Sequence, residues 1–205
     1  RIGIRRTEIE VEHLSDAALE SNLLLQEWSN RGVNLWEVDL QSVALRSGVA
    51  TLTSRYVEVV KGTKAVILDT RKTMPGLRAL DKYAVRCGGG VNHRMSLSDA
   101  ALIKDNHVVA AGGVTQAFNA VRERFPGIPL EIEVDSLEQL SDVLDAGADL
   151  VLLDNFTPDQ MREAVALTRG RAKLEASGGL TLENAADVAT TGVDYVAVGA
   201  LTHSV

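Results

Sequence analysis

Short apolar runs alternate with amphipathic stretches from residue 64 to the end of the chain, and this alternation restricts the possible folds more than any other feature. The amphipathic stretches carry helix signals. Ser136 precedes Gln139 at the spacing of a capping box, and Pro158 suits a first helical turn. Strands that alternate with helices indicate parallel βαβ units. The expected strands cover residues 64–69, 101–104, 130–134, 150–153, 172–175 and 195–198.

Six strands in sequence favour a barrel over an open sheet, although the pattern alone leaves closure of the barrel open. This part of the chain holds about 140 residues, which is short for a full eight-unit barrel. We therefore predict an α/β fold over residues 47–205: a parallel (β/α) barrel of the TIM type that is incomplete, with about seven units. Residues 47–62 are expected to form a helix that leads into the barrel.

The first 46 residues differ from the rest of the chain. Residues 9–13 alternate between apolar and polar like a half-exposed strand, and Ser15 begins a helical pattern that ends near Gly32. We predict a separate short α+β segment over residues 1–46. It contains no motif with obvious chemistry.

The composition argues against several classes of function. A net charge of −7 argues against a nucleic-acid surface. No apolar run reaches the roughly 18–20 residues needed to cross a bilayer, and the first residues do not resemble a secretory signal. A single cysteine, Cys87, fits a reducing compartment. We expect a cytoplasmic protein that acts on small molecules, with neither nucleic acid nor membrane as a partner.

Cations are concentrated in one stretch of this acidic chain, between Asp69 and Lys104, where the only acidic residues are Asp69, Asp81 and Asp99. The cations are Arg71, Lys72, Arg78, Lys82, Arg86, Arg94 and Lys104. A basic pocket inside an acidic protein suggests a small anionic ligand, and a solvated basic face is the alternative.

Polar and glycine residues follow each predicted strand. In parallel α/β folds the site lies at the carboxyl ends of the strands, so these residues are candidates for one shared site. In strand order they are Arg71 and Lys72, Lys104, Glu133, Asp154, Ser177 and Gly178, and Gly199 and His203, while a triglycine loop adds His93 and Arg94.

The cations and the carboxylates suit different ligands. Guanidinium groups bind planar carboxylates through two hydrogen bonds, which suits Arg71 and Arg94, with Lys104 as a point charge and His93 either as a contact or as a structural histidine. Glu133 and Asp154 could hold Mg²⁺ or the hydroxyls of a ribose; salt bridges to the cations are the alternative.

The glycine-rich strand ends suit a phosphate. Ser177-Gly178-Gly179 and Gly199-Ala200 allow backbone N–H groups to approach a ligand closely. The residues together indicate a site for a carboxylated ring and a phosphorylated sugar. A Schiff base on Lys72 or Lys104 is the weaker hypothesis, because such a lysine is normally desolvated, whereas these two have charged neighbours.

Six segments of the chain resemble quinolinate phosphoribosyltransferase (decarboxylating). They are residues 69–78, 82–94, 102–107, 131–139, 152–156 and 198–204. The resemblance runs almost unbroken from about residue 47 to the end, whereas residues 1–46 do not match. It implies that quinolinate and phosphoribosyl pyrophosphate react, with Mg²⁺, to give nicotinate mononucleotide, pyrophosphate and CO₂.

The resemblance also assigns residue roles and an assembly, a homodimer or a higher homo-oligomer. By position, the family's contacts to the quinolinate carboxylates correspond to Arg71, His93, Arg94 and Lys104. The contacts to phosphoribosyl pyrophosphate and its metal correspond to Lys72, Glu133, Asp154, Ser177, Gly178, Gly199 and His203. Of these, Lys72, Glu133 and Asp154 are the implied catalytic residues, and Glu133 and Asp154 the implied metal ligands.

Two departures from the family concern the part before the barrel. Family members carry an amino-terminal sandwich domain, and an arginine of theirs reaches the neighbouring subunit's site; Glu37 stands at that position. We therefore expect weak quinolinate binding and low turnover from this chain. Two other hypotheses stay open: another phosphate-binding barrel, such as a phosphosugar isomerase or lyase, and a barrel that binds ligands without turnover.

Overall fold

The computed structural model describes residues 40–204, with side chains from residue 47 onward. The predicted strand at residues 9–13 and the helix from Ser15 lie outside this part. The strands are β1 (Val66–Leu68), β2 (Ala101–Ile103), β3 (Leu130–Val134), β4 (Leu150–Asp154), β5 (Lys173–Ser177) and β6 (Tyr195–Ala197). The helices are α2 (Leu40–Val59), α3 (Arg78–Cys87), α4 (Asp105–Ala111), α5 (Val114–Arg124), α6 (Leu137–Asp145), α7 (Pro158–Thr168), α8 (Leu182–Thr190) and α9 (Ala200–His203).

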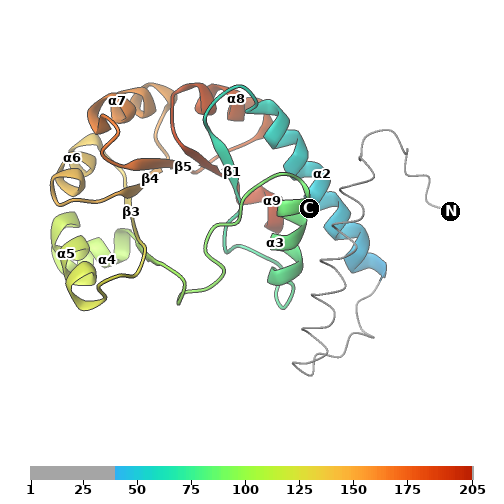
Figure 1. The fold of residues 1–205 in the computed structure, drawn as a ribbon, viewed down its shortest axis with the longest axis horizontal. Helices are drawn as coiled ribbons and strands as arrows, with labels where there is room; N and C mark the ends of the chain where they lie inside the picture. Colours follow the sequence, from blue (N-terminus) through green and yellow to red (C-terminus); the bar gives the residue numbers. More distant parts are fainter. Residues whose placement is uncertain (1–39, 205) are drawn as a thin grey trace. The chain divides into compact units, whose positions relative to one another are not determined.

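The strands form one parallel sheet in the order β1-β6-β5-β4-β3-β2. Figure 1 shows them as an arc, with helices along its outer side. Within the described residues β1 and β2 are the two edges, so the barrel is open between them. The prediction of an incomplete parallel (β/α) barrel is confirmed, and the described part supplies six strands where about seven units are expected.

The predicted helix signals act as expected. The Ser136 hydroxyl accepts a hydrogen bond from the Gln139 backbone N–H at 3.4 Å at the start of α6. Pro158 occupies the first turn of α7, where its missing N–H costs nothing. Helix α2 begins at Leu40, earlier than expected, and continues through the predicted boundary between residues 46 and 47. That domain boundary stays a prediction.

Successive side chains along the strands point alternately into the apolar core and toward a cavity. In β3, Ile132 and Val134 are buried in the apolar core, whereas Glu133 between them lines a cavity. In β4, Val151 and Leu153 belong to the core, whereas Leu152 faces the cavity. Burial of each such apolar side chain stabilises the fold by about 1.5–3 kcal/mol. A two-residue period therefore turns one set of side chains toward the helices and the other toward the site.

None of the helices in residues 40–204 is long and apolar enough to cross a membrane.

Candidate functional site

A cavity of about 800 Å³ lies at the carboxyl ends of the strands. Its walls include all eleven residues that the sequence predicts for the site: Arg71, Lys72, His93, Arg94, Lys104, Glu133, Asp154, Ser177, Gly178, Gly199 and His203. They come from segments spread over more than half of the chain, which the parallel sheet brings to one edge. Their individual roles stay predictions.

The order of the strands places unlike groups on different sides of the cavity. Lys104 follows β2 at one edge of the sheet, and Arg71 follows β1 at the other. Between these edges, Glu133 and Asp154 come from the neighbouring strands β3 and β4, and Gly178 follows β5. These two cations therefore flank the opening of the barrel, while the carboxylates and glycines come from the strands between them.

Three of the seven clustered cations do not line this cavity, which corrects the prediction of one basic pocket. Lys82 is only 1% exposed and pairs with Asp69. Arg78 donates to Thr73 Oγ1 and to two backbone carbonyls, so it holds the loop after β1. Arg86 lies over the Tyr83 ring at 5.6 Å. These three cations serve the structure around the cavity rather than the cavity itself.

The Lys82–Asp69 pair links three segments of the chain. Lys82 Nζ donates to Asp69 Oδ1 at 2.5 Å and to the His93 carbonyl at 2.8 Å. Asp69 also accepts from the His93 backbone N–H at 2.8 Å and from Asn92 Nδ2 at 2.6 Å. Burial lowers the pKa of Lys82 and raises the pKa of Asp69, and their mutual attraction opposes both shifts. The pair holds the main chain of His93 on both sides.

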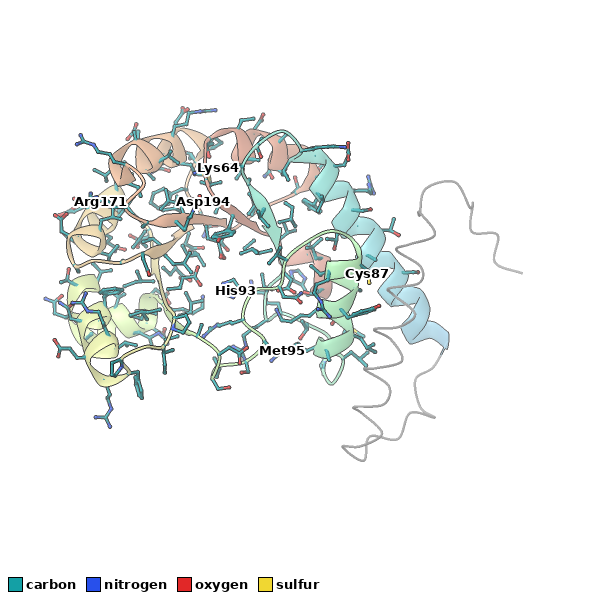
Figure 2. All side chains as sticks on the ribbon, in the orientation of Figure 1. Lys64, Cys87, His93, Met95, Arg171 and Asp194 are labelled. Atoms are coloured by element: carbon teal, nitrogen blue, oxygen red, sulfur yellow. The ribbon has the colours of Figure 1, made fainter. Side chains whose placement is uncertain are left out.

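The side chain of His93 lies between two buried carboxylates. Its Nε2 is 2.9 Å from Glu131 Oε2 and 3.4 Å from Glu175 Oε2. Figure 2 labels His93 on the concave side of the strand arc. Burial lowers the pKa of His93, but the hydrogen bonds to Glu131 and Glu175 outweigh it and raise this pKa to about 10. Burial is also the main reason that the pKa of Glu175 rises to about 7.

The other ring nitrogen of His93 opposes part of this effect. His93 Nδ1 accepts a hydrogen bond from the Arg94 backbone N–H at 2.7 Å, and an imidazolium would have a proton in that place. Both arrangements require a hydrogen on Nε2, between the carboxylates. The cluster of His93, Glu131 and Glu175 has its donor atoms close enough for a metal ion, but Nε2 must lose this hydrogen before it can ligate one.

The Arg94 and Arg71 side chains both line the cavity and lie close enough to interact electrostatically. Burial and the neighbouring Arg71 lower the pKa of Arg94, so an anion bound between the two would be stabilised by both. Arg94 Nη1 donates to the Ala100 carbonyl at 2.8 Å. Arg71 Nε is buried and has no hydrogen-bond partner among the described residues. A buried, unpartnered guanidinium donor facing a cavity is a ready contact for an anionic ligand.

The predicted metal ligands differ in their present partners. Glu133 Oε2 accepts a hydrogen bond from Lys104 Nζ at 2.7 Å. This contact joins a predicted metal ligand to a predicted contact of the quinolinate carboxylates. Asp154 Oδ2 accepts from Asn155 Nδ2 at 2.9 Å. Both carboxylates belong to neighbouring strands and both line the cavity, so their oxygen donors fit a hard cation such as Mg²⁺ that shares its shell with phosphate and water.

At the carboxyl ends of β5 and β6, a ligand can approach the backbone closely. Gly178 has φ +97°, and a Cβ atom there would come within 2.1 Å of Asn155 Oδ1, so only glycine fits. Thr181 caps helix α8 and also lines the cavity, so the first turn of that helix begins at the same wall. Exposed backbone N–H groups at a helix start favour an anion such as phosphate.

Several residues in or beside the cavity were not predicted as site residues. Glu175 lines the cavity and Glu131 lies beside it against His93, and neither was singled out. The sequence signal that could have found Glu131 is its two-residue spacing from Glu133 in β3, which turns both toward the inside of the barrel. Thr181 and Asn155 carry ordinary turn and cap signals, which gave no reason to assign them to a ligand.

Comparison with known proteins connects this cavity to one family. The family model described as "Quinolinate phosphoribosyl transferase, C-terminal domain" matches residues 49–205. The nicotinate-nucleotide pyrophosphorylase (carboxylating) of Mycobacterium leprae is 61% identical over 169 residues, which cover 81% of this chain and 60% of that protein. The probable nicotinate-nucleotide pyrophosphorylase (carboxylating) of Bacillus subtilis is 45% identical over 82% of this chain and 58% of its own length.

Solved structures agree with this comparison. The nicotinate-nucleotide pyrophosphorylase from Francisella tularensis matches with a TM-score of 0.75 and 44% identity, over 77% of this chain and 56% of that chain. A structure of NadC from Streptococcus pyogenes matches with a TM-score of 0.75 and 40% identity, over 80% of this chain and 60% of that one. The chain thus spans about 60% or less of the length of these relatives.

Proposed function

Because the chain belongs to the quinolinate phosphoribosyltransferase family through its C-terminal domain, we propose that it transfers a phosphoribosyl group from phosphoribosyl pyrophosphate to quinolinate. The products are nicotinate mononucleotide, pyrophosphate and CO₂. The observation that carries the proposal is Arg71, whose buried Nε has no partner among residues 40–204 and which faces the same cavity as Arg94 and Lys104. A dianionic ring would satisfy all three cations at once.

The residues would act mainly by position and charge. Arg71, Arg94 and Lys104 hold the two carboxylates, so that the ring nitrogen faces C1 of the ribose and the reaction loses little entropy at the reacting step. Lys72 and His203 lie in the same wall as Gly199, where Lys72 supplies a positive charge and the His203 ring a hydrogen-bonding group toward the phosphates. The Thr202 hydroxyl donates to the Lys72 carbonyl at 2.6 Å, which ties the loop after β1 to α9.

The carboxylates serve the ribose and metal side of the cavity. Glu133 and Asp154 would hold Mg²⁺, which neutralises charge on the leaving pyrophosphate when it is bound. The same carboxylates stabilise positive charge that develops at C1 of the ribose. Gly178 and the start of α8 bind phosphate through backbone N–H groups. Decarboxylation then follows on the pyridinium ring: the electron pair of the breaking C–C bond stays on the ring carbon, where the adjacent positive nitrogen stabilises it, and a proton from water takes the place of the CO₂.

We further propose Mg²⁺ as the cofactor, a homodimer or higher homo-oligomer as the assembly, and the cytoplasm as the place of action. The first is supported by the paired oxygen donors of Glu133 and Asp154, and the others by the sequence features given above. Glu37, which stands where the family has its neighbour-reaching arginine, lies outside the described residues.

The direct test mixes the purified chain with quinolinate, phosphoribosyl pyrophosphate and Mg²⁺ and measures nicotinate mononucleotide together with released CO₂. We expect product only when all three components are present. Quinolinate that binds without turnover would support the binding-only hypothesis instead. Absence of quinolinate binding, with binding of a phosphosugar, would favour another phosphate-binding barrel.

A further inference from the structure

Every polar atom of His93 has a partner inside the protein. The backbone N–H donates to Asp69, and the backbone carbonyl accepts from Lys82, each at 2.8 Å. In the side chain, Nε2 lies against Glu131 and Glu175, while Nδ1 faces the Arg94 backbone N–H. The residue that the sequence singles out as a ligand contact is therefore also held at all four of its polar atoms.

The two carboxylates at Nε2 are buried to an unusual degree. Glu131 and Glu175 are each 2% exposed, and Glu131 Oε1 has no partner among the described residues. Burying a carboxylate costs several kcal/mol unless hydrogen bonds and opposite charge offset it, and His93 is the partner that the structure provides for both. Apolar residues of similar size would fill the same inward positions of β3 and β5 at a lower cost, so packing does not account for these carboxylates.

Arg94 follows His93 directly, and its guanidinium group belongs to the cavity wall. Fixing the His93 ring and main chain fixes the peptide from which the Arg94 side chain starts. A misplacement of about 1 Å at a positioned group can cost about a hundredfold in rate. The geometry of the diacid subsite therefore depends on Glu131, Asp69 and Lys82, which do not line the cavity, and on Glu175, which does.

We propose that Glu131 and Glu175 are positioning residues of the diacid subsite: they hold the Nε2–H of His93 and thereby fix the His93–Arg94 segment, whose main chain is held by Asp69 and Lys82. This inference rests on the proposed function, which identifies the diacid as quinolinate. The hydrogen bonds of His93 do not depend on that identification. Neither carboxylate needs to touch the ligand.

The first experiment reads the hydrogen bonds without any ligand. The full chain is labelled with ¹⁵N-histidine, and the Nε2–H of His93 is assigned by its loss in His93→Gln. We expect this proton to be protected from exchange in the unaltered chain and in Glu131→Gln, whose amide oxygen still accepts, but to exchange at least about tenfold faster in Glu131→Ala, which removes the nearer acceptor at 2.9 Å. Equal exchange rates in Glu131→Ala and Glu131→Gln would overturn the proposal.

The second experiment measures binding of quinolinate and of phosphoribosyl pyrophosphate separately by calorimetry. Glu175→Ala should weaken quinolinate binding by about tenfold or more and leave phosphoribosyl pyrophosphate within about twofold, and Glu175→Gln should recover most of the loss. The matched control is Asp194→Asn, a buried carboxylate with two lysine partners at the opposite end of the strands. Figure 2 shows Asp194 and Lys64 apart from His93. The control should change stability but not quinolinate affinity.

The outcomes separate the two proposals. A folded Glu175→Ala variant with normal quinolinate affinity would leave Glu175 a merely structural residue and refute the positioning role. If Glu175→Ala does not fold, Nε2–H exchange and quinolinate affinity are measured in Glu131→Gln and Glu175→Gln, which keep an acceptor. If both variants lose as much quinolinate affinity as His93→Gln does, the positioning role is refuted as well. If the unaltered chain binds no quinolinate, the proposed function fails, and the exchange experiment alone decides the positioning role.

Discussion

Removal of the Lys82 ammonium group should strongly destabilise the barrel. Lys82 and Asp69 are 1% and 0% exposed, so Lys82→Met leaves a buried carboxylate that keeps two neutral donors but loses its counter-charge. Breaking a buried ion pair on one side costs about 3–5 kcal/mol, a large part of the 5–15 kcal/mol that stabilises a typical domain. With a urea dependence of about 2–3 kcal/mol/M, the unfolding midpoint should fall by about 1–2.5 M.

The assay is urea unfolding followed by circular dichroism, with a double variant and a surface control. Asp69→Asn combined with Lys82→Met removes both charges and should recover at least about 2 kcal/mol relative to Lys82→Met alone. Lys64→Met removes a half-exposed lysine whose partner Asp194 keeps Lys173, so it should cost less than about 1 kcal/mol. A loss below about 1 kcal/mol in Lys82→Met, or strictly additive effects in the double variant, would refute the account of this pair.

Three other predictions concern the cavity. Arg94→Ala should weaken quinolinate binding by about 2–5 kcal/mol, because a desolvated carboxylate loses its partner, with far less effect on phosphoribosyl pyrophosphate; normal calorimetric binding of quinolinate would contradict the assignment. Glu133→Gln combined with Asp154→Asn should reduce turnover more than quinolinate affinity, and near-normal turnover would exclude their role at the metal side. Because the folded pKa of His93 is raised from 6.5 to about 10, the stability that it contributes should be complete below pH 6.5 and lost as the pH rises toward 10. Urea midpoints measured across that range should fall in the unaltered chain more than in His93→Gln, whereas equal slopes would show that the Arg94 N–H keeps the ring neutral.

The sequence predicts the strands of this fold well because their signals are local. All six expected strands occur, with ends that differ by at most two residues, and the cap at Ser136 forms as its spacing indicates. Whether the two edges of the sheet pair with each other could not be predicted from local signals. Whether β1 and β2 meet depends on how many strands the barrel contains and how they tilt, and no run of neighbouring residues encodes that.

The candidate site could be located from the sequence because parallel strands bring their carboxyl ends together. Which cations face the ligand could not be predicted in this way. Lys82 has the same charge as Lys104 and lies in the same basic stretch, yet α3 turns Lys82 inward to Asp69, whereas Lys104 follows β2 into the cavity. The difference depends on which buried carboxylate lies within reach, and Asp69 is thirteen residues away from Lys82 in sequence. The number of charges in a stretch indicates that a site is near. Only tertiary contacts show which cations line the cavity and which are paired inside the protein.

The ion pair of Lys104 and Glu133 gives a prediction in which one substitution acts in opposite directions on two ligands. Lys104 is 48% exposed and Glu133 is 13% exposed, so the pair contributes modestly, about 0.2–1 kcal/mol. Lys104→Ala removes a cation from the diacid side and should weaken quinolinate binding. It also frees Glu133 Oε2, which at present accepts from Lys104 Nζ, so Mg²⁺ binding should become about two- to fivefold tighter. Calorimetric titration with Mg²⁺ alone tests this, with Lys61→Ala, an exposed lysine paired with Glu58, as the control. Weaker or unchanged Mg²⁺ binding in Lys104→Ala would show that Glu133 does not ligate the metal, because the removal of a neighbouring positive charge can only favour a cation at a carboxylate that binds one.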